Sequence, residues 1–345
     1  MIALEWSTFN ERIRMITSAR LNTTATFVGI AALGLTSAAL VQYLSRRAVA
    51  HRKAIGRKLR VSGHAVQLVD RGTGPCVVVL HGNGSMLEDL SSSGLIDQLG
   101  EKYRVIALDR PGFGGTDRDT SGAWTPEREA ALLSEVLSVL GVERAVVVAH
   151  SWGTLVALSL ALRQPTSVDG LVLLSGYYYP TTRLDVALQA PASLPIIGNL
   201  LRHTVLPLIG RLSAPAAFRK LFKPLPVPQR FVDEYSVGMA TRPSQLKSTA
   251  DDTVSMPGAA RAISAHYGEI NVPVHLIAGA QDAIVSTAEQ SERLNEALPA
   301  SSLEILEGVG HMTHHARPDL VVLAVDQLTA QLQTGSPRSS TVAAE

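Results

Sequence analysis

The segment AHSWG at residues 149–153 places one serine, Ser151, between two small residues, Ala149 and Gly153. It follows an apolar run at 145–148 and precedes an apolar stretch at 155–162, which predicts a strand, a tight turn and a helix. Such a turn admits only small neighbours and pushes the serine Oγ out of the sheet. Free N–H groups at the helix start favour a developing negative charge there. We therefore expect Ser151 to be a nucleophile, the alternative being a helix-capping serine.

A serine hydroxyl is a weak nucleophile at neutral pH, so this chemistry needs a histidine base and a carboxylate that orients the base. Both residue types occur beyond the serine, each after a predicted strand. Asp282 follows the run at 274–279, and His311 follows the run at 303–306. The chain order Ser151, Asp282, His311 is typical of one class of serine hydrolases.

Neighbouring residues offer alternatives to these assignments. His314 and His315 compete with His311, which is favoured because it directly follows Gly310, and Asp185 competes with Asp282. Buried histidines are more often held by hydrogen bonds than reactive, so we do not expect His81 and His150 to be catalytic.

Two strand-and-loop segments precede the serine. The apolar run at 77–80 leads into HGNG at 81–84, a loop that could bring a backbone N–H toward the serine. The run at 105–108 leads into DRPGFGG at 109–115. Together with AHSWG, Gly279 and Asp282, and Gly310 and His311, these segments give five matches in a fixed order.

With these five segments the chain resembles the α/β-hydrolase fold family over residues 60–332. The resemblance implies a triad of Ser151, His311 and Asp282, and an oxyanion hole made by the backbone N–H groups of Trp152 and Asn83. It also implies packing and loop-shaping roles for His81, Asp109 and His150. The implied family fold is an α/β architecture with a mainly parallel sheet.

Strand and helix patterns alternate after residue 80, which independently favours a mainly parallel sheet with helices on both faces. Before it, 59–61 and 65–69 predict a hairpin that turns at Ser62 and Gly63. We expect the first part of the hydrolase core at 59–176, an inserted helical cap at 177–270, the second part of the core at 271–333, and a disordered tail at 334–345.

The N-terminal region predicts a membrane anchor. After a segment at 1–24, residues 25–45 are uncharged and long enough to cross a hydrocarbon core as a single-pass helix. A basic linker at 46–58 follows. Between residues 46 and 60 lie seven Lys or Arg residues, against three before the span, which predicts a cytoplasmic hydrolase domain. The alternative is an exported protein whose signal peptide is cleaved at 48–50.

Composition limits the remaining possibilities. The chain has 345 residues, a net charge of +1 and one cysteine, Cys76, so we expect no nucleic-acid partner and no internal disulfide. No cluster has metal-ligand spacing, and the glycine-rich turn at 112–115 lacks G-x-G-x-x-G. No cofactor is expected.

These features predict a membrane-anchored serine hydrolase that cleaves carboxylic esters through an acyl-enzyme, with a small apolar or lipid-like ester as substrate. The apolar cap segment at 195–212, interleaved with Arg202 and Arg211 and followed by Arg219, Lys220 and Lys223, suggests an interface with anionic lipid. A serine at the tight turn argues against the dehalogenase and epoxide hydrolase branches of the resembled family, which carry an aspartate nucleophile at this position. Carbon–carbon bond hydrolase, thioesterase, amidase, perhydrolase and silent binding protein remain alternatives.

Overall fold

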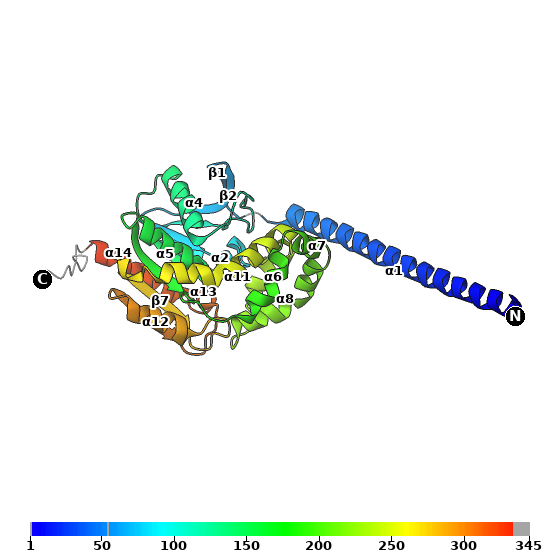
Figure 1. Cartoon of the computed structure of the whole chain (residues 1–345). Helices are drawn as coiled ribbons and strands as arrows, with labels where there is room; N and C mark the ends of the chain where they lie inside the picture. Colours follow the sequence, from blue (N-terminus) through cyan, green and yellow to red (C-terminus); the bar gives the residue numbers. More distant parts are fainter. Residues whose placement is uncertain (1, 54, 334–345) are drawn as a thin grey trace.

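An eight-stranded sheet forms the centre of the molecule (Figure 1). The computed structural model describes residues 2–53 and 55–333. Along the sheet the strands lie in the order β1-β2-β4-β3-β5-β6-β7-β8. The strands are β1 (Arg57–Val61), β2 (His64–Arg71), β3 (Cys76–Leu80), β4 (Arg104–Leu108), β5 (Ala145–His150), β6 (Val168–Leu174), β7 (Val274–Gly279) and β8 (Ser301–Leu306).

Only the N-terminal edge of this sheet is antiparallel. β1 and β2 form the predicted hairpin around Ser62 and Gly63, and β2 runs antiparallel to β4. From β4 to β8 all neighbours are parallel, so the carboxyl ends of these strands lie at one edge of the sheet. The expected α/β class with a mainly parallel sheet is confirmed.

Helices cover both faces of the sheet because its central strands are apolar on both sides. One core packs α4 (Pro126–Val139) and α5 (Gly153–Arg163) against the sheet. The other core packs α2 (Leu87–Ser92), α3 (Leu95–Leu99) and α14 (Pro318–Gln333) against the opposite face. Shorter elements complete this body: the π-helical turn Ala288–Glu292, α12 (Arg293–Ala297) and α13 (Thr313–Ala316).

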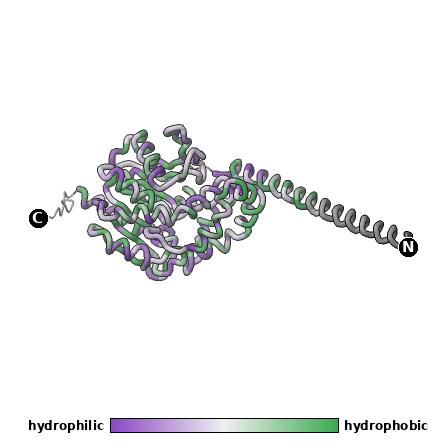
Figure 2. Tube along the Cα trace, viewed as in Figure 1, coloured by the Kyte–Doolittle hydropathy of each residue, from purple (hydrophilic) through white to green (hydrophobic). Residues whose placement is uncertain are grey.

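The segment between β6 and β7 is helical, as the loss of strand alternation indicates. It comprises α6 (Leu184–Ser193), α7 (Ile196–Thr204), α8 (Leu206–Phe222), α9 (Gln229–Glu234), α10 (Val237–Ala240), α11 (Pro243–Ser264) and the 3₁₀ turn Tyr267–Glu269. We refer to α6–α11 as the cap. Hydrophobic stretches occur in the body, in the part of it next to α1 and along the described part of α1 itself (Figure 2).

The N-terminal helix α1 (Ile2–His51) projects away from the body. Its stretch Val28–His51 is long and apolar enough to cross a membrane, although a signal sequence has the same properties. The helix is longer than the expected span at 25–45, so Arg46 and Arg47 lie on its last turns and not in a separate linker. The remainder of the expected linker includes the start of β1. The tail expected at 334–345 lies outside the described residues.

One residue of the expected basic linker points into the protein. Arg52 is almost buried and contacts Glu88 at 2.5 Å and Asp109 at 2.9 Å. Burial alone would lower the pKa of Arg52, but the two carboxylates reverse this and raise it overall. Arg52 is therefore a structural counter-ion and not a free charge available to lipid.

Candidate active site

The turn between β5 and α5 holds Ser151 in a strained conformation. Ser151 has φ of 52°, in the left-handed region that non-glycine residues rarely adopt, and its N–H donates to the Leu174 carbonyl at 2.9 Å. A Cβ added at Gly153 would lie 2.9 Å from the His81 carbonyl oxygen, so only glycine fits there. Backbone strain of this kind is typical of functional sites.

His311 and Asp282 meet beyond the ends of β8 and β7. His311 Nδ1 lies 2.8 Å from Asp282 Oδ2, and both side chains are almost buried. Asp282 Oδ1 accepts hydrogen bonds from the N–H groups of Ile284 and Val285. Burial raises the pKa of Asp282, but His311 and these two donors outweigh it, so the pKa lies below its usual value. The carboxylate is thus ionised and holds Nδ1 of His311 protonated, leaving Nε2 to accept a proton.

His150 links the serine turn to the histidine loop. Its Nε2 donates to the His311 carbonyl at 3.0 Å, and the two rings lie 4.8 Å apart. Ser151 Oγ itself has no hydrogen-bond partner among the described residues. Catalytic hydrogen bonds are often long without substrate and tighten when it binds. The structure therefore brings the predicted nucleophile and base to one edge of the sheet without joining them by a direct hydrogen bond.

The HGNG loop lies directly against Ser151. A Cβ added at Gly82 would be 3.0 Å from Ser151 Cβ. Asn83 Nδ2 donates to Thr253 Oγ1 at 2.8 Å, which ties this loop to cap helix α11. Within the described part of the chain, the N–H groups of Asn83 and Trp152 donate to no other group. They are thus free to bind an oxyanion.

The competing histidines have a different partner. Both His314 and His315 contact Oδ1 of the buried Asp89, at 3.2 and 2.8 Å. Asp185, the competing acid, lies in the cap and pairs with Arg183. Asp282 therefore pairs with His311, whereas His314 and His315 pair with Asp89 and Asp185 pairs with Arg183.

Sequence reasoning missed the cluster of Asp89, His314 and His315, whose ligand-type atoms lie within 4.8 Å of one another. Such a set could in principle hold a metal ion. A metal-bound histidine normally donates its other ring N–H to a partner, yet the buried Nδ1 of His314 has none. Two Nε2–H groups donating to one carboxylate account for the arrangement without an ion.

Sequence reasoning also missed a buried charge network under Trp152. Arg110 donates to Glu129 at 2.8 Å and to Asp252 of α11 at 2.7 Å, while Trp152 Nε1 contacts Glu129 at 3.3 Å. Burial lowers the pKa of Arg110, but the two carboxylates more than compensate and raise it overall. The position of Arg110 after a strand could have suggested a buried cation, but nothing local indicates its partner in the cap.

Two expected packing residues do shape these loops. His81 Nε2 accepts the Arg110 N–H at 2.9 Å, and its Nδ1 donates to the Gly82 carbonyl. Asp109 accepts the N–H groups of Leu87 and Gly115.

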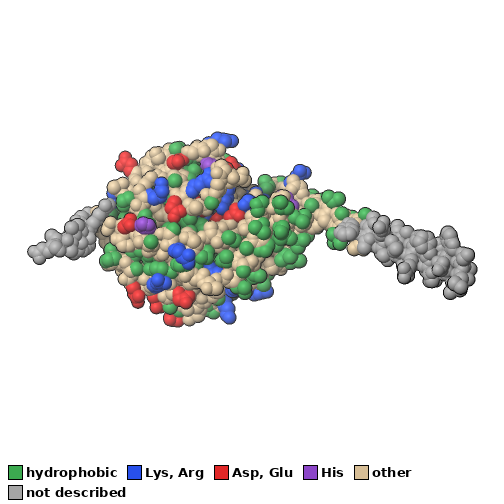
Figure 3. Space-filling view, viewed as in Figure 1, with side chains coloured by type: hydrophobic (Ala, Val, Ile, Leu, Met, Phe, Trp, Pro, Cys, Tyr) green, Lys and Arg blue, Asp and Glu red, His purple; other side chains and the backbone are tan. Residues whose placement is uncertain are grey.

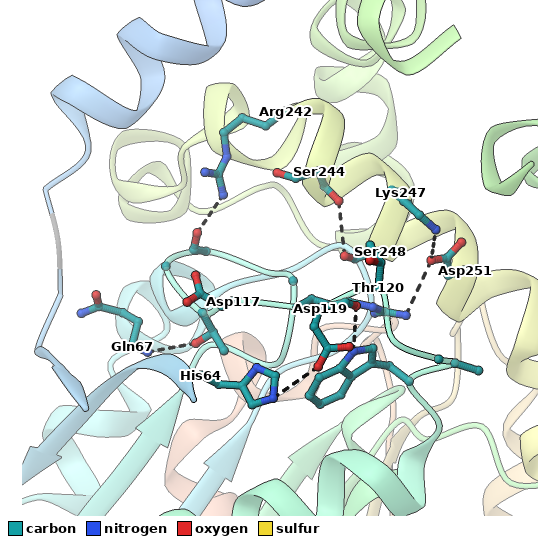
Figure 4. A pocket seen from close by; sticks show the side chains of 18 of the residues that line it. His64, Gln67, Asp117, Asp119, Thr120, Arg242, Ser244, Lys247, Ser248 and Asp251 are labelled. Atoms are coloured by element: carbon teal, nitrogen blue, oxygen red, sulfur yellow. Dashed lines mark hydrogen bonds and ion pairs between the residues drawn. The ribbon is translucent and has the colours of Figure 1, made fainter. Parts of the chain in front are cut away.

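A pocket among the described residues lies away from the candidate triad, none of whose residues line it (Figure 4). It has a volume of about 1330 Å³ and is lined by the β1–β2 hairpin, the loop at 112–125 and the start of α11. Its charged side chains are mostly paired, as in Lys247 with Asp251 and His64 with Asp119. We place the chemistry at Ser151 because the strained turn, the histidine–carboxylate pair and the free N–H donors occur there.

A family model described as the alpha/beta hydrolase family matches residues 77–325, which is most of the chain. The chain belongs to the alpha/beta hydrolase family. The match begins in β3 and ends in α14, so it includes the serine turn, the cap and the histidine loop. The predicted family resemblance is confirmed.

The proteins that resemble this alpha/beta hydrolase in sequence or in structure have been described with different activities. The uncharacterized hydrolase YugF of Bacillus subtilis is 29% identical over 252 residues, covering 69% of this chain and 85% of YugF. A thermophilic esterase from Thermogutta terrifontis is 20% identical with a TM-score of 0.64, covering 80% of this chain and 99% of the esterase. A membrane phospholipase A, described as a bacterial virulence factor, is 18% identical with a TM-score of 0.62, covering 91% of this chain and 99% of the phospholipase. At these identities the two structures show a shared fold only.

Proposed function

We propose that this alpha/beta hydrolase is a membrane-anchored serine esterase acting on apolar carboxylic esters. The observation that carries the proposal is the 2.8 Å contact between His311 and Asp282 beside the strained turn of Ser151. No other described histidine–carboxylate pair adjoins a serine turn with free backbone donors.

In the proposed mechanism Ser151 Oγ attacks the ester carbonyl carbon while Nε2 of His311 takes the hydroxyl proton. The carbonyl π electrons move to oxygen, and the N–H groups of Asn83 and Trp152 bind this oxyanion. When the tetrahedral intermediate collapses, the C–O bond to the alcohol breaks and His311 returns the proton to the leaving oxygen. Water then attacks the acyl-enzyme by the same route, releasing the acid and restoring Ser151. Asp282 holds the imidazole and stabilises its cation throughout.

An ester is the substrate class best matched to this site. Ser151 stands where the dehalogenase and epoxide hydrolase branches carry aspartate, so a covalent ester to a carboxylate side chain is not available. The esterase and the phospholipase A noted above share the fold, which is compatible with ester hydrolysis but cannot select it. An apolar acyl group is proposed because an apolar helix precedes the domain and exposed apolar side chains lie on the cap.

Labelling with a fluorophosphonate probe tests the nucleophile directly, because only an activated serine reacts. We expect the wild-type protein to be labelled and Ser151→Ala to be silent. Hydrolysis of an aryl ester should fall by up to about 10⁶ in turnover for Ser151→Ala and His311→Ala, and by a smaller factor for Asp282→Asn. His314→Ala is the matched control. An equal loss in His314→Ala and His311→Ala would refute the base assignment, and labelling that survives Ser151→Ala would refute the nucleophile.

Esters of increasing acyl length test the substrate class. Each additional buried methylene contributes about 0.8 kcal/mol, so kcat/KM should rise about four-fold per methylene until the acyl site is filled. A preference for acetyl or charged acyl groups would contradict the proposal. Turnover of a vinylogous 1,5-diketone with no turnover of esters would indicate a carbon–carbon bond hydrolase instead.

A further inference from the structure

Large apolar side chains are exposed on three consecutive cap helices. Figure 3 shows apolar side chains gathered over this part of the cap, next to the base of α1. Ile196 is 85% exposed, Leu212 is 84% exposed and Leu184 is 75% exposed. We call the whole set the cap face: Leu184, Leu188, Ile196, Ile197, Leu200, Ile209 and Leu212. Apolar residues gathered in this way mark an interaction surface, whereas single exposed ones are ordinary.

The cap is attached to the apolar part of α1, not only to its end. Ser37 Oγ donates to the Thr204 carbonyl at the end of α7, at 2.7 Å. Val41, one turn further on, is only 1% exposed, and Arg211 of α8 donates to the Leu44 carbonyl at 3.5 Å. The side of α1 that carries these residues is thus covered by protein, while Val28 and Leu33 nearer its N-terminus are exposed.

These contacts fix the height of the cap relative to the proposed membrane span. An α-helix rises 1.5 Å per residue, so the Ser37 contact lies about 12 Å before residue 45, where the expected span ends. If residues 25–45 cross the hydrocarbon, the part of the cap next to Ser37 lies within the same apolar layer. Exposed apolar side chains on that part of the cap are then in lipid and not in water.

From these observations we infer that the cap face is embedded in one leaflet of the bilayer beside α1. The protein then associates with the membrane through two elements, a spanning helix and a partly inserted cap. The inference rests on the membrane-spanning role proposed for α1 and adds a second point of contact. It is independent of the ester chemistry proposed at Ser151.

The basic residues fit this placement in part. Arg46 and Arg47 are exposed on the last turns of α1, and Arg219 and Lys220 are exposed on the last turn of α8. In both helices apolar surface is followed by exposed cations, as expected where hydrocarbon gives way to anionic headgroups.

Two arginines that the sequence suggested for the lipid interface are turned elsewhere. Arg202 is buried and donates to the Ala192 carbonyl, and Arg211 faces α1. The contact with headgroups is therefore expected from the exposed cations at the ends of α1 and α8.

Single fluorescent labels in the full chain test the inference. Cys76 is the only cysteine, so Cys76→Ala gives a background for one new cysteine at a time. Ile196→Cys and Leu212→Cys report on the cap face, and Leu33→Cys reports on α1. Val139→Cys and Leu323→Cys are matched controls, because these apolar residues are exposed on α4 and α14. Each variant carries an NBD label and is reconstituted in phosphatidylcholine vesicles with a minor fraction of phosphatidylglycerol.

Lipids with a nitroxide on the acyl chain quench only labels that reach the hydrocarbon. We expect labels at Ile196 and Leu212 to be quenched as strongly as the label at Leu33, while labels at Val139 and Leu323 stay unquenched. Quenching at Ile196 and Leu212 no greater than at Val139 would overturn the inference. A blue-shifted but unquenched label at Ile196, with cross-linking between copies, would assign the face to a second copy instead.

Failure of the anchor is a separate outcome. An unquenched label at Leu33 would mean that α1 does not cross the bilayer, and the inference would fall with it. Hydrolysis of a water-soluble ester by the same labelled samples distinguishes this from failure of the proposed chemistry, because that reaction needs only an intact Ser151 site. It also shows that each labelled variant is folded.

Discussion

The buried histidine next to the serine turn makes the stability of this hydrolase depend on pH in a predictable direction. Burial is the main cause that lowers the pKa of His81 to about 3, and the nearby Arg110 lowers it further. Nε2 of His81 accepts an N–H at 2.9 Å, so this nitrogen has no room for a proton. In the unfolded chain the same side chain has a pKa of about 6.5.

The sign and size of the effect follow from linkage. Between pH 6.5 and pH 3 the unfolded chain binds a proton at residue 81 that the folded chain does not, so acid favours unfolding. From pH 6.5 to pH 4.5 this one histidine lowers the free energy of unfolding by about 2 kcal/mol, using the ordinary value and the lowered value of its pKa. This is a large share of the roughly 5–15 kcal/mol typical of folded domains. Burial also lowers the pKa of His150 and of His314, so both act in the same direction.

His81→Gln removes the titration and keeps an acceptor for the Arg110 N–H. We expect the variant to be less stable at neutral pH but to lose about 2 kcal/mol less than the wild type between pH 6.5 and pH 4.5. Urea unfolding of the detergent-solubilised chain, followed by tryptophan fluorescence, measures the free energy of unfolding of both proteins at pH 6.5 and at pH 4.5. The pH-dependent loss of the wild type is then compared with that of the variant, so the contributions of all other titrating groups cancel. His266→Gln is the control for replacing a histidine by glutamine, because His266 is exposed. Equal pH dependence in the wild type and His81→Gln would refute the reasoning.

Three further predictions follow from the same structure. In Gly82→Ala the new Cβ would stand 3.0 Å from Ser151 Cβ, so ester turnover should fall about 10-fold or more, whereas Gly258→Ala, where the space is open, should not lower it. Asp252→Asn should lower the free energy of unfolding by about 3 kcal/mol in urea titrations, because it leaves Arg110 buried with one carboxylate fewer. The control Asp319→Asn alters an exposed ion pair and should change the free energy of unfolding by under about 0.5 kcal/mol. In intact cells, added protease should spare the hydrolase domain if the basic residues between 46 and 60 keep it in the cytoplasm. Digestion of the domain would contradict that orientation, and recovery of a soluble form starting near residue 51 would contradict the anchor.

The residues of the candidate site could be predicted from the sequence because each lies shortly after a strand: Ser151 directly follows β5, and Asp282 and His311 lie three and five residues beyond the ends of β7 and β8. An apolar run that ends in a glycine or a polar turn is a local signal, and parallel strands bring such ends together without further information. The hairpin at Ser62 and Gly63 was predictable for the same reason. The sequence distinguishes His311 from His314 less clearly, since both lie in one short segment. The distinction depends on Asp89, which is 225 positions away from His314.

The contacts that hold the cap could not be predicted, because they join segments with no local relation. Arg110 meets Asp252 across 142 positions, and Asp252 lies in a helix whose sequence gives no sign of a buried carboxylate. The sequence places Arg52 in a basic linker and Arg202 at a lipid interface, since a basic residue near an apolar run usually remains solvated. Both are buried because a carboxylate or carbonyl elsewhere in the fold accepts their hydrogen bonds.

The position of Arg52 limits how this protein can be shortened for work in aqueous solution. Starting a recombinant form at the hairpin, near residue 58, would discard the whole helix together with this guanidinium. Glu88 and Asp109 would then stay inside the fold without their cation, a change that typically destabilises a protein by several kcal/mol. A form starting at residue 51 retains the pair, although it still uncovers the cap surface that Val41 occupies. The residue that directly follows α1 is thus part of the folded hydrolase domain. A truncation that removes Arg52 would be expected to yield aggregated protein even with Ser151, Asp282 and His311 present.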